Sequence, residues 1–177
     1  MSVADRSIDP RITESAKEEF LQKGFLDASL QVICKNAGVT TGALYKRFKG
    51  KEELFCALVE STVQDLEEVV RQKSVLPVTL TDEQLKKAWD MDREYMQWWF
   101  DYLYDRYDEM RLLLVFSDGT KYANFEHEWV EGMSHTTYAY YKEAQRRGLT
   151  KTDISEKEMH VMLSSFWTAI CEPLIHG

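Results

Sequence analysis

The stretch AGVTTGALYKRFKGKEELF, residues 37–55, decides how this chain is interpreted. Gly38 and Gly50 divide it into short helical patterns, and Thr40 follows the first break as a helix-capping residue. Lys51 then begins a longer helical pattern, although the N-terminus of a helix repels a cation. A phosphate at that N-terminus would accept the free backbone N–H groups and attract the lysine. The stretch therefore raises the question of DNA binding.

One helical pattern precedes this stretch, and a second one runs into its start. Asp9 and Pro10 suit the start of a first helix, and Gly24 suits its end. Ser29 is placed to cap a second helix, which Gly38 ends about two turns later. Helices this short need neighbours for stability. Three helices with a glycine-containing turn between the last two predict a helix-turn-helix module.

The start of the third helix has the composition expected of a recognition helix, whose first residues face base edges in the major groove. Threonine both hydrogen-bonds a base edge and touches a thymine methyl group. Gly42 costs the helix about 1 kcal/mol relative to alanine, which is understandable if a side chain there would collide with DNA. The pattern alone also fits a module that serves packing only. The predicted DNA-facing residues are Thr40, Thr41, Gly42, Ala43, Tyr45 and Lys46.

Composition places the chain among all-α globular proteins. Of its 177 residues, 44% are hydrophobic and 29% are charged, and only 8 are glycine and 3 are proline. The densest apolar run, LLLVF at 112–116, is far shorter than the roughly 20 residues that span a bilayer. The three cysteines show no pairing pattern, and no export leader opens the chain, so we expect a cytoplasmic protein.

The charge is distributed unevenly along the chain. The formal net charge is −8, which by itself argues against nucleic acid as a partner. Residues 1–51, however, hold nine Lys and Arg against six Asp and Glu, whereas the remainder holds 13 against 24. A basic small module followed by a larger acidic one is compatible with DNA binding by the first.

Further helical patterns follow, and no segment alternates as a half-buried strand should. The spacing predicts a long aromatic-rich helix over 82–106, a short one over MRLLLVF, and one over 121–147 that Gly148 ends. Ser155 and Glu158 form a capping box for a last helix to about residue 171, which Pro173 should end or kink.

The motifs F-x-x-x-G-F at 20–25, S-L-x-x-I at 29–33 and AGVTTGALYKRFKGKEEL at 37–54 together resemble the DNA-binding domain of the TetR/AcrR family of bacterial transcriptional repressors. The resemblance covers about residues 9–60. It implies that Gln31 reaches a base and that Ser29, Tyr45 and Lys51 contact phosphates. Gly50 departs from the Asn, Ser or Asp that is commoner before the fourth helix.

The resemblance also implies a domain plan: residues 1–50 as the DNA-binding domain and 51–177 as a domain for ligand binding and dimerisation, with 51–72 as a linking helix. Aromatic and methionine side chains suit a planar or cationic ligand that is small and hydrophobic. The same side chains also fit a plain helical core. The candidate ligand residues are Asp92, Tyr95, Trp99, Tyr102, Phe116, Phe125, Trp129 and Met133.

Dimerisation in the family usually uses the last two long helices, and we assign the apolar face of the final predicted helix to the homodimer interface. The four histidines lack metal-ligand spacing, and no nucleophile, P-loop or dinucleotide motif occurs, so we expect no metal, no cofactor and no enzyme. The predicted interface residues are Met159, Met162, Phe166, Trp167 and Ile170.

These observations predict a ligand-responsive repressor that binds a near-palindromic operator in double-stranded DNA as a dimer. The ligand would change the separation of the two recognition helices, which must match about 34–36 Å between half-sites. The alternative is an all-α small-molecule binding protein whose helix-turn-helix is structural only.

Overall fold

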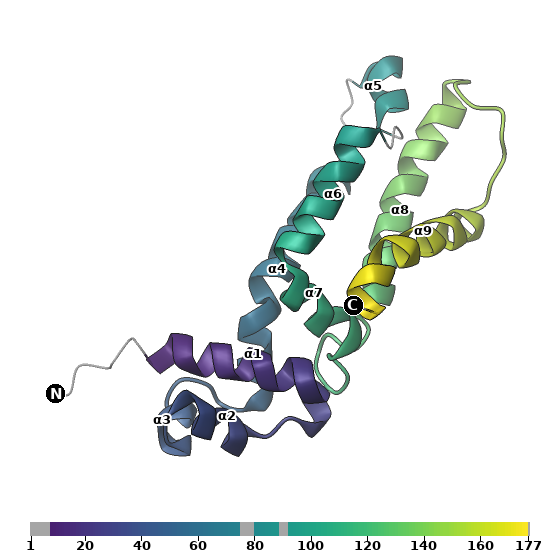
Figure 1. Cartoon of the computed structure of the whole chain (residues 1–177). Helices are drawn as coiled ribbons and strands as arrows, with labels where there is room; N and C mark the ends of the chain where they lie inside the picture. Colours follow the sequence, from purple (N-terminus) through teal and green to yellow (C-terminus); the bar gives the residue numbers. More distant parts are fainter. Residues whose placement is uncertain (1–7, 75–79, 89–91, 177) are drawn as a thin grey trace. The chain divides into compact units, whose positions relative to one another are not determined.

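The structure is a computed structural model that describes residues 8–74, 80–88 and 92–176 (Figure 1). Within these ranges the regular structure is entirely helical, as the sequence predicted. The helices are α1 (Ile8–Asp27), α2 (Leu30–Ala37), α3 (Thr41–Tyr45), α4 (Lys51–Ser74), α5 (Asp82–Lys87), α6 (Arg93–Asp105), α7 (Tyr107–Val115), α8 (Phe125–Arg146) and α9 (Glu156–His176).

The described residues form two compact units. The first contains α1, α2, α3, the part of α4 up to Val63, and residues 106–124, which include α7. The second contains the rest of α4 together with α5, α6, α8 and α9. The functional boundary predicted at residue 50 stays a prediction. The structure adds that residues 106–124 belong to the same compact unit as the helix-turn-helix.

The core of the first unit is built from the apolar stripe of α1. Ile12, Ala16 and Phe20 are fully buried, as their spacing predicted. The Phe20 ring packs 5.2 Å from the Phe55 ring of α4 in an edge-to-face arrangement, and Phe25 lies 5.6 Å from Phe55. Burial of each large apolar side chain contributes roughly 1.5–3 kcal/mol, so this cluster joins α1 to α4.

Residues 106–124 are attached to the rest of the first unit by hydrogen bonds at two places. The Phe25 N–H donates to the Phe116 carbonyl at 3.0 Å, where α1 ends. The Tyr122 hydroxyl donates to Glu60 at 2.7 Å, and Lys121 lies 3.2 Å from the same carboxylate. These bonds tie the segment between α7 and α8 to α1 and α4.

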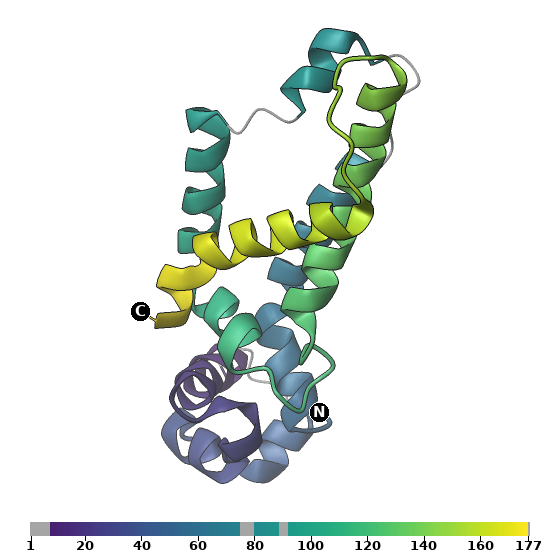
Figure 2. The same cartoon turned by 90° about the vertical axis from the view of Figure 1, so that its right-hand side faces the viewer.

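In the second unit, α8 and α9 pack against one another (Figure 2). The side chains of Trp129 and Tyr141 on α8 and of Met159 and Trp167 on α9 are buried. The predicted capping box is confirmed: the Ser155 N–H donates to Glu158 at 2.7 Å, and the Glu158 N–H donates to the Ser155 hydroxyl at 3.3 Å.

The helix expected over 82–106 and the end expected for the last helix at about residue 171 need correction, whereas the kink expected at Pro173 is present. The single helix expected over 82–106 is two helices, α5 and α6. Its interruption follows from local capping, because the Asp92 carboxylate accepts the Tyr95 N–H at 2.8 Å as the N-cap of a new helix. The final helix runs on to His176 with Pro173 inside it, and its last turn bends away from the helix axis (Figure 2). Residues 89–91, inside the expected helix, lie outside the described residues.

Candidate nucleic-acid interface

The helix-turn-helix geometry is set by Gly38 and Thr40. Gly38 adopts φ 65° and ψ 36°, a left-handed conformation that glycine takes without strain, and its N–H donates to the Lys35 carbonyl. Thr40 then caps α3, because its hydroxyl accepts the Ala43 N–H at 3.2 Å. Leu44, fully buried, anchors the helix to the core. These local signals position α3 against α2.

The residues predicted to face DNA lie on the outside of this module. Gln31 on α2 is exposed, and Tyr45 is 55% exposed although it is a large aromatic residue. Ser29, Ala43 and Lys51 are half-buried. Exposed small and polar side chains allow a close approach of a groove to the start of α3. The remaining predicted residues, all exposed, are Thr40, Thr41, Gly42 and Lys46.

Lys51 has a structural partner that the sequence did not indicate. Its ammonium group donates to the Leu26 carbonyl at 2.8 Å and to the Ala28 carbonyl at 3.1 Å, and it lies 4.8 Å from the centre of the Phe25 ring. Carbonyls at the end of α1 therefore stabilise the cation at the start of α4. Lys51 therefore joins α4 to the α1–α2 turn.

The backbone of Ser29 is also held by a structural partner, the buried carboxylate of Glu19. Glu19 is only 7% exposed, and its carboxylate accepts the Ser29 backbone N–H at 3.0 Å. The carboxylate thereby holds the backbone of Ser29, the N-cap residue of α2. The Ser29 hydroxyl makes no capping bond within the described chain, so it remains available to a phosphate oxygen.

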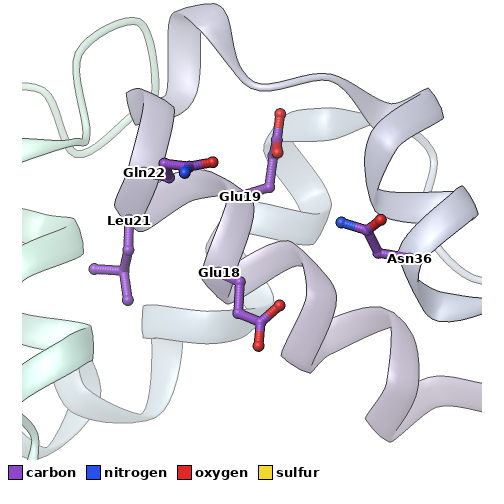
Figure 3. A pocket seen from close by; sticks show the side chains of 5 residues that line it. All are labelled: Glu18, Glu19, Leu21, Gln22 and Asn36. Carbon is purple, nitrogen blue, oxygen red and sulfur yellow. The ribbon is translucent and has the colours of Figure 1, made fainter.

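A shallow hollow of about 410 Å³ lies beside the module, and it is acidic rather than basic (Figure 3). The carboxylates of Glu18 and Glu19 on α1 and the amide of Asn36 on α2 line it, together with Leu21 and Gln22. Negative charge disfavours phosphate, so this hollow is not part of a DNA-binding surface.

The predicted ligand residues divide between the two units. Trp99 of α6, with Tyr95 and Tyr102 packed edge-to-face against it, lies 6.3 Å from Trp129 of α8 between ring centres. Phe125 is buried and Met133 is half-buried on the same helix as Trp129. Phe116, by contrast, belongs to the first unit, where it lies beside Gly24.

Two residues have different surroundings from those the sequence suggested. Trp167, assigned to the dimer interface, is only 2% exposed and lies 6.1 Å from Trp99 and 5.5 Å from Trp129. We call Trp99, Trp129 and Trp167 the tryptophan cluster. Asp92, a candidate ligand residue, is the N-cap of α6. The spacing of the buried residues Met159, Trp167, Ile170 and Leu174 was the signal for an inward stripe on α9.

Only some of the residues predicted for the dimer interface on α9 are accessible to a second chain. Met159 and Ile170 are 2% and 5% exposed, so their side chains pack inside the unit. Phe166 is half-buried, whereas Met162 is 59% exposed and its neighbour Val161 is 63% exposed. The accessible apolar part of α9 therefore centres on Val161 and Met162. The assignment of this helix to a dimer interface stays a prediction.

Within the described ranges, no group of three or more His, Cys, Asp or Glu side chains is arranged to hold a metal ion. None of the described helices combines the length and the apolar content needed to cross a bilayer.

The first residues of α3 are small and leave the start of this helix accessible, and a glycine turn joins the helix to its supporting helices. This arrangement defines the helix-turn-helix class of DNA-binding modules. Residues 12–58 match the model of bacterial regulatory proteins of the tetR family. A 57-residue stretch is 44% identical to the HTH-type transcriptional regulator SrpR of Pseudomonas putida, covering 32% of this chain and 27% of that relative. Residues 12–58 therefore form a DNA-binding domain of the TetR family.

Solved structures extend the similarity of fold beyond the matched domain. A TetR-family transcriptional regulator from Streptomyces coelicolor A3 superposes with a TM-score of 0.65 at 19% identity, covering 92% of this chain and 76% of that chain. A gamma-butyrolactone receptor, an ArpA-like protein, gives a TM-score of 0.53 at 19% identity, over 95% and 74% of the two chains. At these identities the likeness concerns the fold.

Proposed function

We propose that this protein is a transcriptional repressor that binds a near-palindromic operator as a dimer and leaves it when a small molecule binds the second unit. The observation that carries the proposal is the exposed start of α3, held on a packed helix-turn-helix. Family membership supports DNA binding by this surface, and the cytoplasm is the expected location. The proposed base-facing residues are Gln31, Thr40, Thr41, Gly42, Ala43, Tyr45 and Lys46.

Phosphate contacts are proposed for Ser29, Tyr45 and Lys51, which flank this surface. Because Lys51 also ties α4 to the end of α1, its removal would disturb the fold as well as DNA binding. Lys46 is exposed and is therefore the cleaner variant for testing a contribution of positive charge. Because Lys46 is proposed to face base edges, its removal should lower the affinity for the operator more than the affinity for other sequences.

The direct test is fluorescence anisotropy on duplex DNA from upstream of the protein's own gene, beside a scrambled duplex, at about 50 and 200 mM salt. A repressor should bind its own duplex selectively and lose orders of magnitude in affinity across this range. Lys46→Ala removes a proposed base-facing cation, so it should weaken binding to the upstream duplex more than binding to the scrambled duplex. Lys151→Ala, an equal charge change at an exposed position of the second unit, is the matched control.

Weak binding of equal strength to both duplexes would favour the alternative, a small-molecule binding protein with a structural helix-turn-helix. A ligand is supported by the fold shared with the gamma-butyrolactone receptor and by the aromatic residues around the tryptophan cluster. If the upstream duplex is bound selectively, release from this duplex is the assay for compounds that bind the second unit.

For the dimer, we propose that the exposed apolar patch of Val161 and Met162 on α9 faces a second copy of the chain. Met162→Glu would place a charge in that interface and should shift the protein towards monomer in sedimentation experiments. Glu172→Gln, at an exposed position on the same helix, is the control. An unchanged dimer of the Met162 variant would place the interface elsewhere.

A further inference from the structure

The indole N–H groups of Trp129 and Trp167 are not explained by the packing of the second unit. Both side chains are more than nine-tenths buried, with exposed fractions of 6% and 2%. Their ring centres are 5.5 Å apart, and neither Nε1 atom has a hydrogen-bond partner among the described residues. The Trp129 N–H group belongs to α8, and the Trp167 N–H group belongs to α9.

A buried donor without an acceptor destabilises a fold, and most buried polar atoms in proteins are therefore paired. Phenylalanine at either position would provide a packed aromatic ring without an unpaired N–H group. The indole nitrogen is a donor only, so the missing partner must bring a lone pair. A bound molecule with an oxygen acceptor would satisfy donors that the chain leaves unsatisfied.

The side chains around the two indole N–H groups indicate the shape and polarity of the rest of the bound molecule. Trp99 meets Trp129 and Trp167 edge-to-face at 6.3 and 6.1 Å, and Tyr95 and Tyr102 pack against Trp99. Aromatic walls of this kind favour a planar, apolar body. The carboxylate of Asp92, which the sequence offered as a partner for a cation, instead accepts the Tyr95 N–H.

We propose that the tryptophan cluster binds a planar apolar molecule carrying a carbonyl or carboxylate oxygen, which accepts the N–H groups of Trp129 and Trp167. This inference rests on the ligand-responsive function proposed above and specifies its ligand. The ligand is neutral or anionic rather than cationic, because the buried polar groups of the site are donors.

The test uses the full chain labelled with ¹⁵N and the indole N–H signals of its 5 tryptophans. Trp129→Phe and Trp167→Phe each remove one signal and thereby assign it, and thermal unfolding checks that each variant is folded. The probes are four matched compounds: 2-naphthamide, 2-naphthoate, naphthalene and 2-naphthylmethylammonium. All four compounds contain the naphthalene ring system, but only the amide and the carboxylate carry an oxygen acceptor on it.

The amide or the carboxylate should shift both assigned signals downfield and bind at least about tenfold more tightly than naphthalene or the ammonium compound. Each of the two variants should lose about tenfold in affinity for the acceptor-bearing probe. Trp98→Phe, which changes a 44% exposed tryptophan of α6, should keep the affinity of the unaltered protein.

The proposal is overturned if no probe moves the two signals, if the acceptor gives no gain over naphthalene, or if the free protein already shows both N–H groups bonded to water. DNA anisotropy in the same samples separates this result from a failure of the regulatory function. Selective DNA binding without any probe effect overturns the ligand inference alone. Probe binding by a protein that binds no DNA supports the tryptophan site and contradicts the repressor function.

Discussion

Replacement of Gly42 by alanine should separate the stability of α3 from its function. Gly42 lies inside the first turn of this helix, and a Cβ atom built there would have the Thr40 hydroxyl as its nearest neighbour, at 3.9 Å. That distance is ordinary van der Waals contact, so the free protein has room for a methyl group. Alanine should stabilise the helix by up to about 1 kcal/mol, which raises the melting temperature of a chain this size by roughly 2–4 °C.

The effect on DNA binding should have the opposite sign. If the start of α3 lies against base edges, the added methyl group has to occupy space between the helix and the major groove. A loss of tenfold or more in affinity corresponds to about 1.4 kcal/mol or more. The measurements are thermal unfolding of the free protein and anisotropy on the upstream duplex, with the salt concentration held constant. A protein that becomes more stable and binds DNA less well would show that glycine is retained for close approach.

Gly132→Ala provides the matched control. Gly132 lies inside α8, and a Cβ atom there meets no other described atom within 4 Å beyond its helix and chain neighbours. This variant should gain stability by a similar amount and keep its affinity for DNA. If Gly42→Ala binds the duplex as tightly as the unaltered protein, the reasoning about close approach at α3 is refuted. If it loses stability, the steric argument for the free protein is wrong instead.

Three further outcomes follow from local contacts. Tyr122→Phe removes a hydroxyl that donates to Glu60 at 2.7 Å and should lower the free energy of unfolding by about 1–2 kcal/mol in urea titrations; no change would mean that this bond contributes nothing. Hydrogen bonds from two arginines lower the pKa of Glu143 to about 2, below its ordinary 4.5. A Glu143→Gln variant should therefore be less stable than the unaltered protein at pH 7, and the difference should close as the pH falls from about 4.5 towards 2; a difference that is constant over this range would contradict the assignment. Burial raises the pKa of Cys171 to about 12, so mass spectrometry should find a thiol reagent on the half-buried Cys56 first and on Cys171 only after unfolding.

The helix-turn-helix could be predicted because its determinants are local. Gly38 needs a left-handed conformation, Thr40 caps the next helix, and Leu44 supplies the buried anchor; each of these acts within a few residues. Ser155 and Glu158 were recognised as a capping box for the same reason. The break between α5 and α6 was equally local, since Asp92 caps α6, but the aromatic periodicity through 82–106 obscured it.

The all-α class, the helix-turn-helix and the resemblance of its residues to the TetR family follow from the sequence, because helix periodicity, caps and turn residues are written in short segments. Which partner a side chain meets across distant segments depends on the three-dimensional packing. Lys51 binds carbonyls about 25 residues before it, and Trp167 lies inside the tryptophan cluster rather than on a dimer face. An apolar stripe shows that one face of a helix is buried, but it does not show against what, because the partner is fixed by the packing of the whole unit.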